Sequence, residues 1–183
     1  MAKHSKWDNI KRVKEVKDAK RSKIFSKISR LIMVAAKQGG GDPDSNPNLR
    51  LAVEKAREAR MPNENIDKAI RKGTGEGSEG SNFSEAVYEG FGPNGEAFYI
   101  RALTDNRNRT VSEVRNVFNK FAGSLGGAGS TSYIFLPDPT KPSYTVELSD
   151  LRYADKLTNL IDELEENDDI QEVYFNFVLP PQL

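Results

Sequence analysis

The chain has 183 residues, 37% of them hydrophobic and 30% charged, with no cysteine and a single histidine, His4. The length allows one domain or two small ones, and the lack of cysteine excludes disulfides, thiolate metal sites and a cysteine nucleophile. No apolar run approaches the roughly 20 residues of a membrane span, and the basic N-terminus lacks the apolar part of a signal peptide. We expect a cytoplasmic protein without metal, cofactor, membrane partner or small-molecule substrate.

The formal net charge of zero hides an asymmetry between the two parts of the chain. Residues 1–72 carry 19 basic and 9 acidic side chains, whereas residues 73–183 carry 8 basic and 18 acidic ones. The isoelectric point of the whole chain therefore says little about its partners, and the charge of each part must be considered separately.

A basic arm opens the chain and runs into a helix. The first thirty residues hold eleven Lys or Arg and three acids. Because unpaired charges are costly to bury, such a segment stays in water or meets an anionic partner. Apolar residues at helical spacing from Ile24 to Ala35 predict an amphipathic helix that begins near Asp18 and ends at the glycines 39–41.

Two shorter helices follow. Asn46 and Pro47 form a favourable pair for the N-cap and the first position of the second helix, and Pro62 begins a third helix that ends at Gly73. Residues 1–73 are thus predicted to be a basic arm with a three-helix domain. Residues 74–82 have the Gly, Ser and Glu composition of a linker.

The apolar period changes after the linker, and residues 83–183 read as a ferredoxin-like α+β domain. Tyr88 begins a short strand, and a hairpin turn at 93–95 leads to a second strand at 96–103. Thr110 and Glu113 resemble a capping box before a helix that stops at Gly123. The remaining elements are predicted as strands at 130–136 and 144–148, a helix at 151–164, and a strand at 171–178. From residue 96 the order is βαββαβ, with the Tyr88 strand as an N-terminal addition.

Three local patterns each have two interpretations. Residues 90–95 match a dinucleotide-binding glycine pattern, but a strand follows where that pattern needs a helix, so a hairpin is favoured. The acids at 163–169 lack the spacing of a calcium loop and are better explained as a solvated helix end, or as a group that contacts the basic arm when no nucleic acid is present. In residues 104–110, Asp105 or Asn106 caps a helix, or Arg107 and Arg109 bind a nucleic-acid backbone.

The basic arm is the strongest functional signal. Its cations would bind phosphates, and Trp7 could stack on an unpaired base, which is worth about 1–3 kcal/mol. The alternative is a solvated arm with Trp7 packed on the helical domain. No catalytic constellation is apparent, so we expect a protein that is not an enzyme. The candidate nucleic-acid-binding residues are Lys3, His4, Lys6, Trp7, Lys11, Arg12, Lys14, Lys17, Lys20, Arg21, Lys23, Lys27, Arg30, Arg107 and Arg109.

Several ordered motifs carry a resemblance to a known family. They are His4-Ser5-Lys6-Trp7, Ala19-Lys20-Arg21, Gly39-Gly40-Gly41-Asp42-Pro43, Met61-Pro62, Tyr88-Glu89-Gly90, and the segment Leu103-Thr104-Asp105-Asn106-Arg107-Asn108-Arg109-Thr110. With these motifs the chain resembles the YebC/PmpR family. The resemblance implies a cytoplasmic, non-enzymatic regulator of gene expression, either a DNA-binding transcriptional regulator or a ribosome-associated translation factor that binds ribosomal RNA and relieves stalling at proline runs.

The chain departs from the family at one place. The family usually carries a third domain between the two middle strands of the ferredoxin-like unit, whereas here only the turn at 137–142 occupies that place. The resemblance therefore implies a shortened member without the inserted domain. A protein-interaction module, in which the sheet and the acidic helix bind a partner, stays open as a further alternative.

Overall fold

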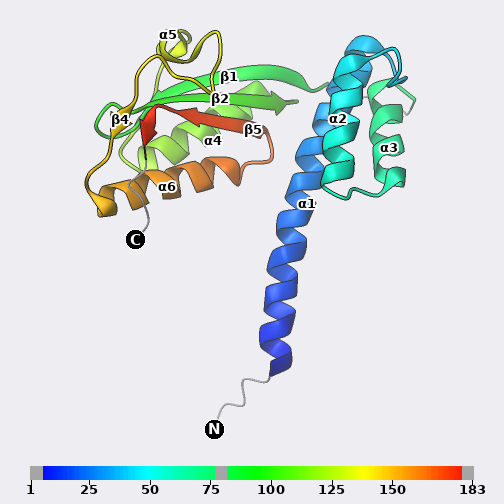
Figure 1. Ribbon diagram of the computed structural model, residues 1–183, viewed down its shortest axis with the longest axis horizontal. Helices are drawn as coiled ribbons and strands as arrows, with labels where there is room; N and C mark the ends of the chain where they lie inside the picture. The colour runs from blue at the N-terminus through cyan, green and yellow to red at the C-terminus, as the bar shows by residue number, and fades with distance from the viewer. Residues whose placement is uncertain (1–5, 77–81, 179–183) are drawn as a thin grey trace. The chain divides into compact units, whose positions relative to one another are not determined.

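The computed structural model describes residues 6–76 and 82–178, and side chains from Lys20 onward. The chain divides into two compact units, Met1–Ser81 and Asn82–Leu183 (Figure 1). The first is helical, and the second combines an antiparallel sheet with helices. Among the helices of the described ranges, none combines the length and the apolar character that crossing a bilayer requires.

The first unit contains three helices, α1 (Lys6–Gly39), α2 (Pro47–Glu58) and α3 (Asn63–Gly73). Small apolar side chains let the helices approach closely, and a Cβ on Gly73 would lie 2.5 Å from the carbonyl oxygen of Met33. The fully buried residues Ile32, Leu49 and Ala56 lie in the core between the helices. The three predicted helices are therefore confirmed, although α1 begins twelve residues earlier than Asp18.

Asn46 joins α1 to α2. It is 4% exposed, its Oδ1 accepts the backbone N–H of Leu49 at 3.1 Å, and its Nδ2 donates to the carbonyls of Ala35 and Gly40, each at 2.8 Å. One side chain thus caps the start of α2 and satisfies carbonyls at the end of α1.

The end of α2 has a left-handed residue that is not glycine. Arg60 has a φ of 58°, and the N–H of Met61 donates to the carbonyl of Ala56 at 2.9 Å. This hydrogen bond closes a Schellman-type C-terminus, a position where glycine is favoured because it has no Cβ.

The second unit is built on a four-stranded sheet of β1 (Ser84–Phe91), β2 (Ala97–Thr104), β3 (Ser124–Leu125) and β5 (Ile170–Phe175). The strand order is β3-β1-β2-β5, and all neighbours are antiparallel. The predicted hairpin joins β1 to β2, with Gly95 at a φ of 90°.

Two longer helices, α4 (Arg107–Lys120) and α6 (Leu151–Glu165), cover one face of this sheet (Figure 1). Phe98 and Ile100 of β2 join the core between the sheet and these helices. Ala97 and Tyr99, which alternate with them along β2, pack on the other face with the short helix α5 (Ser132–Phe135).

The α+β class, the N-terminal helices and the antiparallel sheet are confirmed, but three strand assignments differ. Residues 130–136 contain α5 instead of a strand, because the carboxylate of Glu89 binds the backbone N–H groups of Thr131 and Ser132. β1 lies inside the sheet, between β3 and β2, so it is more than an N-terminal addition. The strand predicted at 144–148 is reduced to β4 (Val146–Glu147), which pairs in parallel with β6 (Phe177–Val178).

Candidate nucleic-acid interface

Helix α1 is far longer than the helices that pack against it. At about 1.5 Å per residue, its 34 residues span about 51 Å, whereas the 12 residues of α2 span about 18 Å. Among the described side chains of α1, the core begins at Phe25 and Ile28. Within the first unit, the N-terminal part of α1 therefore continues beyond its partner helices.

The predicted arm is thus a helix from Lys6 onward instead of an irregular segment. The sequence prediction relied on apolar spacing, which begins only at Ile24. Lys, Arg, Glu and Ala are all good helix formers, so the polar segment propagates the helix without an apolar face. Helical backbone spaces the cations regularly along one axis.

The predicted cations fall into three groups. Lys3 and His4 lie outside the described residues, and the side chains of Lys6 to Lys17 are outside the described part of α1. Lys20 and Arg21 are exposed, whereas the side chains at 23, 27 and 30 are half-buried. Arg107 and Arg109 belong to the second unit.

Arg21 lies at the point where the three-helix core ends. Its Nη2 donates to the carbonyl of Arg60 at 3.3 Å, and its guanidinium lies 5.3 Å from the centroid of the Phe25 ring. The side chain therefore connects α1 to the turn that follows α2, and Arg60 itself is exposed there.

The segment 104–110 joins β2 to α4, and Asn106 is the N-cap. Its Oδ1 accepts the backbone N–H of Arg109 at 3.1 Å, which confirms the capping interpretation for Asn106. The predicted capping box at Thr110 is wrong, because α4 has already begun at Arg107 and Thr110 is buried inside its first turn.

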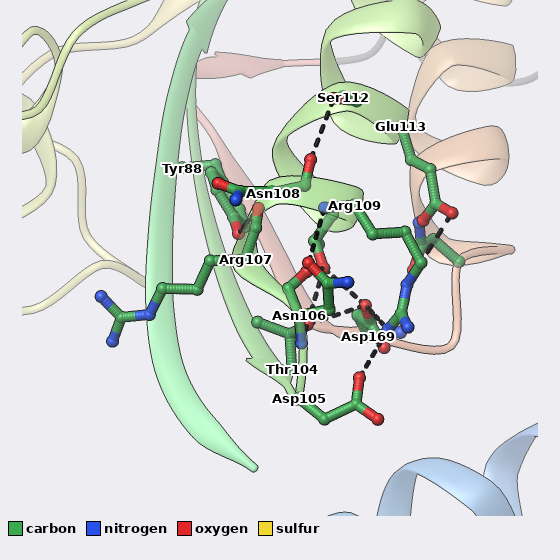
Figure 2. A network of polar contacts seen from close by, with 12 residues as sticks. Tyr88, Thr104, Asp105, Asn106, Arg107, Asn108, Arg109, Ser112, Glu113 and Asp169 are labelled. Carbon is green, nitrogen blue, oxygen red and sulfur yellow. Dashed lines mark hydrogen bonds and ion pairs between the residues drawn. The ribbon is translucent and has the colours of Figure 1, made fainter. Parts of the chain in front are cut away.

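A buried carboxylate, Asp169, organises this segment (Figure 2). Asp169 is 2% exposed, and its Oδ2 accepts the hydroxyls of Thr110 at 2.5 Å and Thr104 at 3.1 Å. The two hydroxyls also lie 2.7 Å from each other. The two threonine hydroxyls therefore stabilise the buried carboxylate charge.

Arg109 completes the network from the solvent side. Its Nη2 lies 2.8 Å from Oδ2 of Asp169 and 2.8 Å from Oδ1 of Asp105, and its Nε lies 4.0 Å from Oε1 of Glu113. The hydrogen bond to Asp169, and to a smaller extent the one to Asp105, raise the pKa of the guanidinium above its ordinary high value. Arg109 therefore has an internal structural role in this state of the molecule.

Arg107 is placed differently from Arg109. Its side chain points away from the carboxylates of the network, as Figure 2 shows, and its Nη2 donates to the backbone carbonyl of Glu85 at 2.7 Å. Because Arg107 is exposed and has no carboxylate among these contacts, it is the better placed of the two arginines to meet an anion.

Sequence reasoning missed Asp169 as a network residue, since it was grouped with the solvated acids at 163–169. Nothing in the local pattern distinguishes it from Asp168, which is exposed. Asp169 is buried only because the chain before β5 pairs with β2. This pairing includes the hydrogen bond from the N–H of Leu103 to the carbonyl of Asp169 at 2.8 Å. Within the described side chains, no group of acids or histidines is arranged to hold a metal ion.

The fold and these contacts define a two-unit α+β protein, in which a helical unit with a long cationic helix precedes an antiparallel-sheet unit. Two family models match the chain. The TACO1/YebC N-terminal domain matches residues 5–76, and the TACO1/YebC second and third domain matches residues 83–137. The chain belongs to the TACO1/YebC family, which confirms the resemblance seen in the sequence motifs.

Relatives and a solved structure agree with this assignment. A probable transcriptional regulatory protein of Persephonella marina is 41% identical over 246 aligned positions, which cover 100% of this chain and 98% of the relative. One from Thermotoga petrophila is 58% identical over 135 residues, covering 74% of this chain and 53% of the relative. The crystal structure of a conserved hypothetical protein from Aquifex aeolicus has a TM-score of 0.82 at 36% identity, covering 91% of this chain and 93% of that one.

The alignment with the Persephonella marina relative is longer than this chain, which has 183 residues. The relative therefore carries residues that have no counterpart in this chain, and the absence of the inserted domain stays a prediction. The second family model stops matching at residue 137, beside the turn at 137–142 where the sequence predicts the missing domain.

Proposed function

We propose that the chain is a non-enzymatic, nucleic-acid-binding regulator of gene expression that acts in the cytoplasm as a DNA-binding transcriptional regulator. The observation that carries this proposal is the extension of α1 beyond its packed core, with cations repeated along it. The names of the relatives, probable transcriptional regulatory proteins, support the regulatory role.

The electrostatics of α1 favour a polyanionic partner. Neighbouring Lys and Arg side chains at spacings of three and four residues repel one another along an isolated helix. A nucleic acid relieves that repulsion and releases its condensed counterions, so the affinity should fall steeply as the salt concentration rises. Contacts of this kind position a protein on a backbone and do not by themselves read sequence.

A ribosome-associated translation factor is the second candidate, because phosphate contacts from a long helix suit ribosomal RNA as well as DNA. Sedimentation with ribosomes separates the two. Co-migration that depends on α1 favours translation, and a sequence-specific footprint on DNA without co-migration favours transcription.

The decisive variant removes residues 1–19 and keeps the core residues Phe25 and Ile28, which a deletion of residues 1–30 would take away. We expect this truncation to lower nucleic-acid affinity at least about tenfold and to flatten its salt dependence. Binding would be measured by fluorescence anisotropy with labelled RNA and DNA.

A matched control is the triple variant Arg115→Gln, Lys141→Gln, Arg152→Gln, which removes the same net positive charge from exposed positions of the second unit. The control should bind like the parent chain. Equal affinities of the truncated and parent proteins would exclude α1 as the nucleic-acid interface.

A further inference from the structure

One face of α1 can be followed along the whole helix in steps of three or four residues, the spacing that keeps residues on one side. In the C-terminal half this face is apolar and belongs to the core of the first unit. Toward the N-terminus the same steps reach cations and then two apolar residues. We call these positions the seam face: Trp7, Ile10, Lys14, Lys17, Arg21, Phe25, Ile28, Ile32 and Ala35.

Arg21 marks where the partner of the seam face changes. C-terminal to it, Phe25 and Ile28 pack on α2 and α3. Arg21 itself donates to the carbonyl of Arg60, just past the end of α2. At about 1.5 Å per residue, Lys17 and Lys14 stand about 6 and 10 Å further along the axis. These positions therefore lie past the end of α2.

Where the helical partners end, the cationic part of the seam face favours an anionic partner over a further helix. A face that continues a packed core is normally apolar, and three consecutive cationic positions on it oppose packing against another helix of this unit. The steps from Lys14 to Lys17 and from Lys17 to Arg21 are three and four residues, so the charges repel along the helix. A row of phosphates satisfies all three.

Arg60 gives an independent reason to place the partner here. It is exposed, and it occupies a left-handed position, φ 58°, where glycine would be less strained. Its carbonyl accepts the guanidinium of Arg21. Arg60 thus places an exposed cation in a strained backbone position next to the cationic part of the seam face, which motivates a test of its charge.

We propose that a nucleic-acid backbone lies along the seam face from Lys14 to Arg21 and continues onto Arg60, with an unpaired base against Trp7. This interface deepens the proposed function and rests on it. It selects, among the many cations of α1, those on one face, and it adds Arg60, which the sequence alone did not single out.

The test compares two triple variants of the full chain. The seam variant removes the charges of the seam face by the substitutions Lys14→Gln, Lys17→Gln and Arg21→Gln. The control triple removes the same charge from other faces of α1 by the substitutions Arg12→Gln, Lys20→Gln and Lys23→Gln. Affinity is measured for single-stranded RNA, duplex RNA and duplex DNA of mixed sequence over a range of KCl concentrations, with circular dichroism to check that both variants fold.

We expect the seam variant to lose at least about tenfold in affinity, with the slope of log affinity against log salt shallower by about 2, for three lost contacts to a single strand. The control triple should retain most of the affinity and the slope. The parent chain should bind single-stranded RNA more tightly than duplex RNA, since only an unpaired base can stack on Trp7, and the seam variant, which keeps Trp7, should retain that preference.

The outcomes separate the two levels of inference. Equal losses of affinity in the two triple variants would contradict the seam face as the interface, but they would still agree with nucleic-acid binding by α1. No loss in either triple, together with an unchanged affinity after truncation of residues 1–19, would exclude α1 as the interface, and failure of the parent chain to bind any of the probes would overturn the proposed function. Equal affinities of the parent chain for duplex and single-stranded RNA would overturn the contact of a base with Trp7.

Arg60→Gly gives a second readout that a merely structural role would not produce. It removes the cation and supplies the residue that the left-handed backbone favours, so the melting temperature should stay the same or rise while affinity falls about threefold or more. Lys55→Gln, an exposed cation of α2, is the control. Unchanged affinity in Arg60→Gly would remove Arg60 from the interface.

Discussion

The carboxylate of Glu89 is a buried charge that holds the segment around α5 to the sheet. Glu89 is 5% exposed, and it accepts the backbone N–H groups of Gly129, Thr131 and Ser132 as well as two hydroxyls. Burial opposes the charge, but these hydrogen bonds outweigh it and lower the pKa of Glu89 below its usual value. A single residue of β1 thereby decides that the segment at 130–136 is not a strand.

Glu89→Gln should destabilise the second unit by about 2 to 4 kcal/mol at neutral pH, because an amide nitrogen would face backbone donors. Since the folded pKa is lowered, the contribution of Glu89 is present above its unfolded pKa of about 4.3 and is lost as the pH falls through the folded value. The difference between the two proteins in urea denaturation should therefore shrink at acid pH.

The control is Glu85→Gln, an exposed glutamate on the same strand. It should change stability by less than about 0.5 kcal/mol. A Glu89→Gln effect of the same size at neutral and acid pH would contradict the role of the charge.

At the scale of elements, Asp169 joins three parts of the chain that are distant in sequence. Its hydrogen bonds and ion pair reach Thr104 at the end of β2 and Thr110 and Arg109 in the first turn of α4, while Asp169 itself precedes β5. This network fixes the turn that carries Arg107, so the direction of the exposed arginine depends on a buried carboxylate in another element.

Asp169→Asn should cost the second unit about 3 kcal/mol, because it removes the charge that pairs with Arg109 and leaves an amide among hydroxyl donors. Asp168→Asn is the matched control, since this neighbour is exposed. Urea denaturation followed by circular dichroism measures both. A loss of the same size in the two variants would show that the network contributes nothing specific.

At the scale of the whole molecule, the two units have separate cores. Among the described side chains, one hydrophobic cluster lies in the first unit and two lie in the second, and none of these three includes residues from both units. Charge is divided in the same way, with the basic excess in residues 1–72 and the acidic excess in residues 73–183. The units should therefore lose structure independently when one of them is destabilised.

Asn46→Ala tests this independence. It removes the cap of α2 and leaves carbonyls of α1 without their donor, which should cost the first unit about 2 kcal/mol. In hydrogen exchange, protection should fall in residues 20–76 and stay unchanged in residues 82–178, and Asp169→Asn should do the reverse. Asn48→Ala, an exposed neighbour, is the control. Joint loss of protection in both units would contradict separate cores.

The sequence by itself determined the features that follow from local patterns. The three helices of the first unit, the β1–β2 hairpin, α6, the Asn46 cap and the family motifs all rest on spacing, turn residues or capping chemistry, which act over a few neighbouring residues. The charge asymmetry is likewise a property of composition. These are enough to give the α+β class and a nucleic-acid hypothesis.

Tertiary structure decided what depends on contacts between distant segments. Glu89 and Asp169 look like other acids in the sequence, and only sheet pairing buries them and turns them into organising charges. The same holds for β1 in the middle of the sheet, and for the contact of Arg60 with Arg21, which forms only when α1 and α2 are assembled. Burial and long-range pairing are set by the whole chain, and so no local pattern specifies them.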